Sequence, residues 1–242
     1  MPEHTRALGI IPARGGSKSV PRKNLHPLLG RPLIVWSIES ARRAKSLDRL
    51  IVSTDDPEIA EVARAHGAEV PFLRPPELAA DDTPDLPVFQ HALRMLGDAA
   101  GYVPDAIVHL RPTQPLRTAQ EIDEAVGLWE RTRADCVKSV RPAGEHPFKM
   151  YRLREGRLVP YLDTAERRRR GPDVPRQSLE PLYLSAGVVD VVRREIVEAG
   201  STEGAAVVPY FAAPERYVNL DSARDFEIAE ALMRALGRGV EP

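Results

Sequence analysis

The stretch that decides the fold is residues 7–24, ALGIIPARGGSKSVPRKN, where an apolar run stops at a proline and a short cationic loop follows. Residues 7–11 have the continuous apolar character of a buried parallel strand. Gly15, Gly16 and Ser17 let the following main chain approach a ligand closely, because glycine lacks Cβ and tolerates positive φ. The pattern predicts a buried strand followed by a loop suited to a triphosphate.

Four cations surround this bend, and no acidic residue lies between Leu8 and Gly30. The loop therefore has a positive electrostatic potential that solvent or a bound anion must neutralise. Oriented backbone N–H groups would add to this potential. Its spacing fits neither the P-loop pattern nor the glycine pattern of dinucleotide-binding folds. From the residues alone, a solvated basic turn remains the alternative to an anion site. The four cations are Arg14, Lys18, Arg22 and Lys23.

Length and composition limit the class of protein. The 242 residues suffice for one large α/β domain with a real core. A net charge of −1 gives no electrostatic support for a general role on nucleic acid or a membrane surface. The single cysteine, Cys136, excludes an internal disulfide framework. No apolar run approaches the ~18 residues of a membrane span, and MPEHTRALGII lacks a signal-peptide core, so we expect a cytoplasmic protein.

Strand and helix patterns alternate along most of the chain, which predicts a mostly parallel sheet with helices on both faces, a Rossmann-like three-layer α/β fold. Pro57 at a first turn and Gly67 at a stop bound one of the helices. The expected strands are 7–11, 49–56, 69–74, 106–110, 134–142, 182–192 and 205–212, and the expected helices are 31–45, 57–67, 86–96, 121–133, 193–200 and the segment after Asp221.

Polar residues follow the strands at the edge where open α/β sheets bind ligands. Residues 53–55, Ser-Thr-Asp, end the second strand, and residues 74–85, RPPELAADDTPD, form a polar, proline-rich loop after the third. Asp81, Asp82 and Asp85 in this loop either cap the helix that follows or serve the ligand edge, since aspartate is favoured at helix N-termini.

The segment RPTQPLRT at residues 111–118 is a proline turn that runs into a capping box, Thr118-x-x-Glu121. Trp129 and Cys136 are expected to be core residues. Near the C-terminus, Asp221 lies at a predicted strand end, where it can cap the last helix or bind Mg²⁺. The inward face of that helix is expected to be Phe226, Ile228, Ala229 and Leu232.

Two of these segments resemble the signature motifs of the acylneuraminate cytidylyltransferase family, whose members make CMP-sialic acids and related CMP-nonulosonates. They are IPARGGSKSVPRKN at residues 11–24 and PTQPLR at 112–117, and the resemblance extends over essentially the whole chain. It implies one nucleotidyltransferase domain over residues 1–242, with residues 143–180 as a dimerisation and lid insertion in a homodimer. Within the insertion, the run Glu166 to Arg170 is expected to be a solvated, mobile stretch.

The resemblance also implies that CMP is transferred from CTP to an acidic sugar-like acceptor, with Mg²⁺ and release of pyrophosphate. It implies catalytic roles for Arg14, Lys18 and Asp221, and nucleotide binding by Ala13, Arg14, Gly15, Ser17, Lys18, Asn24, Arg74 and Thr83. It implies acceptor binding by Lys23, Arg111, Gln114, Lys149, Arg176, Gln177 and Asp190, and metal binding by Asp221 and Asn219.

Three positions depart from the sialic-acid enzymes. Asn219 pairs with Asp221 where two aspartates are usual, which predicts weaker Mg²⁺ binding. Ala186–Gly187–Val188–Val189–Asp190 stands where N-G-A-x-Y is common, and Arg111 replaces a glutamine. Together they predict an anionic acceptor other than N-acetylneuraminic acid, with Arg111 on its acidic group and Asp190 on an amine.

Other readings of the same motifs remain open. One keeps the reaction with another nucleotide, such as GTP, or with a non-sugar anionic acceptor such as a phosphonate. Another is a non-catalytic, nucleotide-binding regulatory protein whose metal site has decayed, as Asn219 permits. The presence of Arg14, Lys18 and Asp221 speaks against decay. Pyrophosphate release with any acceptor would separate an enzyme from a regulatory protein.

Overall fold

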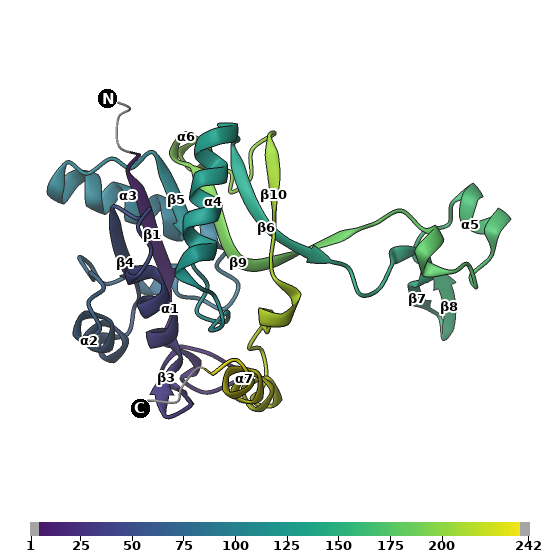
Figure 1. Cartoon of the computed structure of the whole chain (residues 1–242), viewed down its shortest axis with the longest axis horizontal. Helices are drawn as coiled ribbons and strands as arrows, with labels where there is room; N and C mark the ends of the chain where they lie inside the picture. The colour runs from purple at the N-terminus through teal and green to yellow at the C-terminus, as the bar shows by residue number, and fades with distance from the viewer. Residues whose placement is uncertain (1–4, 238–242) are drawn as a thin grey trace. The chain divides into compact units, whose positions relative to one another are not determined.

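The computed structural model describes residues 5–237, and its central feature is a six-stranded, mostly parallel sheet in the order β10-β6-β9-β5-β1-β4 (Figure 1). β1 runs parallel to both β4 and β5, whereas β9 runs antiparallel to β5. The predicted Rossmann-like α/β architecture is therefore confirmed. The strands are β1 Ala7–Pro12, β4 Arg49–Ser53, β5 Ala106–His109, β6 Cys136–Pro142, β9 Tyr183–Arg193 and β10 Val207–Phe211.

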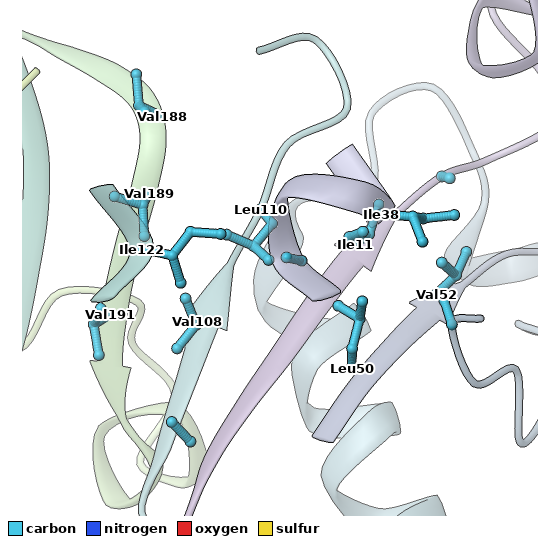
Figure 2. Packing of buried hydrophobic residues seen from close by; sticks show 14 of the residues in the cluster. Ile11, Ile38, Leu50, Val52, Val108, Leu110, Ile122, Val188, Val189 and Val191 are labelled. Carbon is cyan, nitrogen blue, oxygen red and sulfur yellow. The ribbon is translucent and has the colours of Figure 1, made fainter. Parts of the chain in front are cut away.

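Alternate side chains of the strands supply two separate hydrophobic cores, because successive residues of a strand point to opposite faces. Ile11 packs in the same cluster as Ile38 of α1 (Figure 2). Ile10, the next residue along, packs on the other face with Phe89 of α3. Helices α1 Leu33–Arg42, α2 Pro57–Ala65 and α4 Ala119–Thr132 cover the first face, and α3 Asp85–Ala100 and α6 Arg194–Glu198 cover the second.

Local signals in the sequence account for the helix starts. Asp56 caps α2 by accepting hydrogen bonds from the two backbone N–H groups of Glu58 and Ile59. The capping box predicted at Thr118 and Glu121 is present at the start of α4. Trp129 and Cys136 are buried as predicted, and burial raises the pKa of the Cys136 thiol to about 12, as expected for inert packing. No helix within residues 5–237 is long and apolar enough to cross a membrane.

A third cluster joins the last helix to a short hairpin. Phe226, Ala229 and Met233 form the buried stripe, at spacings of three and four residues. The prediction placed Ile228 on this face, and it was wrong, since Ile228 is 43% exposed. The elements are α7 Ala223–Ala235, β2 Pro27–Leu28 and β3 Arg31–Pro32, preceded by 3₁₀ turns at Lys23–Leu25 and Pro214–Arg216.

The strand predicted at residues 69–74 is not formed. A single parallel bridge joins Glu69 to Ile51 beyond the sheet edge. Pro71 lies two residues further on and has no N–H to extend the ladder. The chain turns away to a 3₁₀ turn at Pro76–Leu78. This early end of regular pairing leaves residues 74–85 as the loop that was predicted at the ligand edge.

Residues Val140–Ser185 form a second compact unit, and the predicted insertion, residues 143–180, lies within it. Phe148, Val174 and Leu179 make its small core. Its elements are the hairpin β7 Tyr151–Arg154 and β8 Arg157–Pro160, the helix α5 Ala165–Arg170, and 3₁₀ turns at Pro147–Lys149 and Arg176–Ser178.

The arginine run of this unit is helical rather than an unstructured solvated stretch. Thr164 caps α5, and Arg167 is buried with its Nε donating to the carbonyl oxygen of Phe148 at 2.9 Å. Arg168 and Arg169 remain exposed. The prediction failed at Arg167 because a single arginine of a charge run can satisfy a backbone carbonyl while its neighbours stay in water.

Candidate active site

A cavity of about 560 Å³ opens where β1 and β5 end, and its wall includes Pro12 and His109, the last residues of those two strands. This is the edge at which open α/β sheets bind ligands, and the volume suits a small-molecule site. The structure brings together nine predicted site residues in this wall: Arg14, Ser17, Lys18, Lys23, Asn24, Arg74, Thr83, Arg111 and Asp221.

Two cations of the glycine loop converge on one carboxylate. Asp81 Oδ1 lies 2.6 Å from Arg14 Nη1, and Asp81 Oδ2 contacts Lys18 Nζ. The hydrogen bond from Lys18 holds the pKa of the Asp81 carboxyl below its usual range. Arg14 and Lys18 therefore point at a common position in which an anion is already favoured, as a polyphosphate site requires.

Contacts with neighbouring residues fix the backbone of the glycine loop. The Gly15 N–H donates to Asp55 Oδ1 at 2.9 Å, and a Cβ on Gly15 would lie 2.7 Å from Asp56 Oδ2, so only glycine fits there. Asn24 Nδ2 donates to the Arg14 carbonyl oxygen at 2.9 Å. Neither Ala13 nor Gly15, both predicted to bind nucleotide, lines the cavity.

Arg74 ties the 74–85 loop to the end of β4. Its Nε donates to Ser53 Oγ at 3.1 Å, its Nη2 donates to the Ser53 carbonyl oxygen, and its Nη1 reaches the Leu78 carbonyl oxygen at 3.4 Å. Burial lowers the pKa of Arg74 to about 10, which leaves it charged at neutral pH. This buried cation fixes the start of the loop, and it also lines the cavity.

Arg111 occupies another part of the wall between two carboxylates. Its Nη1 donates to Asp190 Oδ2 at 3.0 Å and its Nη2 to Asp85 Oδ2 at 3.3 Å. Asp85 Oδ2 also lies 3.8 Å from Nδ1 of His109. Burial, with Arg111 nearby, holds the pKa of His109 well below its usual range, so this imidazole is neutral at pH 7.

Two predicted acceptor residues lie behind the wall. Asp190 is buried, and its Oδ1 accepts from both the N–H and the Oγ of Ser139 at 2.9 and 3.0 Å. Both of its oxygens are thus engaged, which differs from the expectation that Asp190 faces an amine. Gln114 is also buried, and its Nε2 donates to the Ala186 carbonyl oxygen at 3.1 Å and to Asn219 Oδ1 at 3.3 Å.

The predicted metal pair has an arrangement of its own. Asn219 Nδ2 donates to Asp221 Oδ2 at 2.6 Å, so the amide presents a donor rather than an oxygen to the carboxylate. Lys23 Nζ donates to the Leu220 carbonyl oxygen at 2.7 Å and lies 3.7 Å from Asp221 Oδ1. Across residues 5–237, no group of three or more His, Cys, Asp or Glu side chains is placed to hold a metal ion.

Asp221 does not have the local setting that was expected. It lies in irregular chain rather than at a strand end, and the cap of α7 is Ser222, which forms a capping box with Asp225. Asp221 therefore does not cap α7, and it lines the cavity instead.

The remaining predicted residues belong to the second unit. Arg176 and Gln177 line a cavity of about 450 Å³ within that unit, where Arg176 Nη2 donates to the Ala143 carbonyl oxygen at 2.6 Å. Lys149 is exposed at the end of a 3₁₀ turn. Their predicted contact with the acceptor stays a prediction.

Comparison with known proteins shows which family carries these motifs. The profile of the family described as cytidylyltransferase matches residues 8–147, more than half of the chain and all of the glycine loop. The chain belongs to the cytidylyltransferase family. This confirms the resemblance found in the sequence.

Individual relatives agree with this assignment. The cytidylyltransferase chain is 35% identical over 172 residues to the pseudaminic acid cytidylyltransferase of Campylobacter jejuni, an alignment covering 70% of this chain and 72% of that protein. It is 26% identical over 235 residues to the N-acylneuraminate cytidylyltransferase of Escherichia coli, covering 97% of this chain and 54% of the relative. This chain thus spans about half the length of the Escherichia coli protein.

A solved structure shares the fold. CMP:2-keto-3-deoxy-manno-octonic acid synthetase complexed with CTP superposes with a TM-score of 0.71 over 96% of this chain and 100% of that one, at 14% identity. At that identity the likeness concerns the fold alone, and it confirms the nucleotidyltransferase type of Rossmann-like sheet.

Sequence reasoning missed part of the cytidylyltransferase site. His109 was taken as the interior of a strand, although its place at the carboxyl end of a parallel strand was a signal for the ligand edge. For Asp81 and Asp85, the sequence did not decide between capping of the next helix and a place at the ligand-binding edge. The structure places both in the cavity wall, and Asp85 is also the first residue of α3.

Proposed function

We propose that this cytidylyltransferase transfers CMP from CTP to a nonulosonic acid and releases pyrophosphate. The observation that carries the proposal is the charge layout of one cavity. Arg14 and Lys18 meet at one anion position, and Arg111 presents a guanidinium elsewhere in the wall. A triphosphate and an acidic acceptor need two such cationic positions in a single site. The names of the relatives support the sugar class of the acceptor.

Arg14 and Lys18 would hold the phosphate oxygens in the place where they now hold Asp81. Charge develops on the pyrophosphate as the bond from the α-phosphorus to its bridging oxygen breaks, and fixed cations stabilise that charge. The acceptor oxygen forms the new bond to the α-phosphorus and loses its proton to solvent. Such a displacement needs alignment and charge stabilisation more than covalent help from the protein.

Arg74, Asn24, Ser17 and Thr83 line the same cavity and would shape the nucleotide end of the site. Arg74 is the strongest candidate for the base pocket, since its guanidinium is fixed by Ser53 and Leu78. A buried guanidinium held in one orientation can discriminate between bases through the N–H groups that Ser53 and Leu78 do not use, because a mismatched base would leave those groups unpaired. Arg74 is therefore our proposed contribution to the choice of CTP.

The residues present fit a magnesium ion that the substrate phosphates also hold. Asp221 offers a carboxylate to the cavity, and Mg²⁺ commonly uses one or two carboxylates together with phosphate oxygens. When bound, the ion would offset negative charge on the leaving pyrophosphate. Asn219 supports Asp221 by donating to Oδ2, which orients the carboxylate.

We further propose that the enzyme is a homodimer in which the second unit makes the contact. Leu153 and Leu158 stand opposite each other across the β7–β8 hairpin, and they are 71% and 69% exposed. An apolar pair of this size on a strand surface favours a partner surface. A cytoplasmic location stays a prediction.

The test is a screen for pyrophosphate release. Purified protein is incubated with CTP, GTP, ATP or UTP and with pseudaminic acid, N-acetylneuraminic acid or 2-keto-3-deoxy-manno-octonic acid. We expect release with CTP and pseudaminic acid and little with N-acetylneuraminic acid. No release with CTP and any acid would overturn the function, and efficient use of N-acetylneuraminic acid would overturn the acceptor preference.

A further inference from the structure

Two of the three sequence departures described above touch each other. Arg111, where a glutamine is common, donates from Nη1 to Oδ2 of Asp190, where a tyrosine is common, at 3.0 Å. The two residues are 79 positions apart in the chain. The Asp190 side chain is only 8% exposed, against 33% for Arg111, so the carboxylate lies behind the guanidinium as seen from the cavity.

Asp190 is itself fixed from behind. Its Oδ1 accepts from the N–H and Oγ of Ser139, and Ser139 Oγ in turn accepts from the backbone N–H groups of Val188 and Val189 at 3.0 and 3.2 Å. Ser139 is fully buried. This chain of hydrogen bonds leaves the carboxylate one orientation, with Oδ2 turned toward Arg111.

The backbone at Gly187 leaves room for the Arg111 side chain, because glycine has no Cβ. Gly187 has a φ of +66°, and a Cβ there would lie 3.0 Å from Arg111 Nη1 and 3.2 Å from its Cδ. Any other residue at position 187 would be strained and would crowd the guanidinium. Gly187 and Asp190 therefore define one place for the Arg111 side chain, at the end of β5.

The second partner of Arg111 is Asp85, which is far more exposed than Asp190. Asp85 accepts from Nη2 at 3.3 Å, its side chain is 40% exposed, and it lines the cavity. Exposed ion pairs of this type contribute little to stability and exchange readily. A buried, hydrogen-bonded carboxylate such as Asp190 leaves an uncompensated charge if its partner departs. A ligand anion can therefore replace Asp85 but not Asp190.

We propose that Asp190 is a positioning residue that holds Arg111 in the cavity wall, so that the carboxylate of the acceptor replaces Asp85 on Nη2. Asp190 does not touch the acceptor and acts through Arg111. The proposal rests on the function proposed above, since it assigns the acceptor end of that same site. In this proposal, the departures at positions 111 and 190 belong together, because each residue is the partner of the other. They are then not two separate losses of contacts with the sugar.

The test is a double-variant cycle with Asp190→Asn and Arg111→Gln, using CTP and pseudaminic acid as substrates. We expect Asp190→Asn to raise the KM for pseudaminic acid at least tenfold and to change the KM for CTP less than twofold. The double variant should be no worse than Arg111→Gln alone, because Asp190 acts only through Arg111. Independent, multiplying losses in the double variant would overturn the proposal.

Asp85→Asn is the matched comparison, since it removes the exposed partner of the same guanidinium. We expect it to lower the KM for pseudaminic acid severalfold, because a competing carboxylate is gone. A rise in that KM would overturn the exchange of Asp85 for the acceptor.

A structural readout separates this proposal from the proposed function. In a crystal structure of Asp190→Ala, we expect the Arg111 guanidinium to leave its place against Gly187. If it stays there, the positioning role is overturned, whatever the activity of the protein. If wild-type protein releases no pyrophosphate but Arg111 moves in the variant, the proposed function fails while the positioning of Arg111 by Asp190 holds.

Discussion

We expect Arg14 and Lys18 to bind the triphosphate, because both contact the same carboxylate in the wall of the cavity. We expect Arg14→Ala and Lys18→Ala each to lower kcat on the order of 10²–10³-fold, the range found when one donor to a developing charge is removed. Pyrophosphate release measures the effect, and circular dichroism should show an unchanged fold.

Arg22→Ala is the control for this pair. Arg22 belongs to the same cationic loop, but it pairs with Asp56 and Glu58 and does not line the cavity. Its removal should change kcat less than threefold if position, rather than loop charge, matters. Unchanged kinetics in either Arg14→Ala or Lys18→Ala would rule out their phosphate role.

Asn219 and Asp221 give a prediction about magnesium. We expect Asp221→Ala to abolish activity, and Asn219→Asp to lower the Mg²⁺ concentration needed for half-maximal rate, since a second carboxylate binds a hard cation better than an amide. A magnesium titration of pyrophosphate release measures both effects. If Asn219→Asp needs more Mg²⁺ than the wild type, the metal does not lie at this pair.

The positions of single residues in the candidate site could be predicted only where a sequence motif contained them. Arg14 and Lys18 belong to the glycine loop and Arg111 to the proline turn, and all three line the cavity as these motifs predicted. The partners of Arg111 could not be found in this way, since Asp190 lies 79 residues away. The same holds for the Asn219 amide, whose nitrogen faces Asp221 because Gln114 occupies its oxygen.

The 74–85 loop, as an element, places Asp81 against Arg14 and Lys18. If these two cations bind the triphosphate as proposed, its binding must separate them from Asp81, so this ion pairing would oppose binding. We expect Asp81→Asn to tighten CTP binding about three- to tenfold in calorimetry without turnover, because the amide competes less well for the two cations. The neighbouring Asp82→Asn is the control and should leave affinity unchanged. Weaker CTP binding by Asp81→Asn would show that Asp81 helps to hold the nucleotide.

Most elements could be predicted because their apolar runs are long and periodic. β1, β4 and β5 form from such runs, and the helices that follow them start at proline, aspartate and threonine signals. The failures are local. Residues 69–74 have strand composition, but Pro71 removes the N–H needed to continue the pairing that Glu69 begins.

Helix faces were harder to predict than helices. The prediction for α7 put Ile228 in the core and left Met233 out, whereas Met233 is buried in the cluster that joins α7 to the neighbouring hairpin. Arg167 shows the same limit, because its buried contact with Phe148 depends on a fold that no local charge pattern reveals. Tertiary contacts, rather than propensity, settle such positions.

At the scale of the whole molecule, the chain divides into a large unit that contains the six-stranded sheet and a small second unit, Val140–Ser185. The insertion that the family resemblance implied, residues 143–180, lies within this unit. Its core is three buried side chains, Phe148, Val174 and Leu179. So small a core supplies little stability by burial, which favours further burial against another surface.

A second copy of the chain is the surface that we expect to cover this unit. Leu153 and Leu158 pair across β7 and β8 and are both mostly exposed. A two-fold contact through this hairpin would bury both leucines on each copy. We expect the wild type to have twice the 26.8 kDa chain mass in light scattering. The double variant Leu153→Asp and Leu158→Asp should be a monomer, because four added charges cannot be buried together without partners.

Ile228→Asp is the control for the hairpin variant, since Ile228 is an exposed apolar side chain of the first unit. It should remain a dimer. Both variants should bind CTP as the wild type does, because the cavity that holds Arg14 and Lys18 is built from the first unit alone. A monomeric wild type, or a hairpin variant that stays dimeric, would remove the second unit from the interface. Loss of CTP binding in the monomer would instead show that the nucleotide end depends on the partner copy.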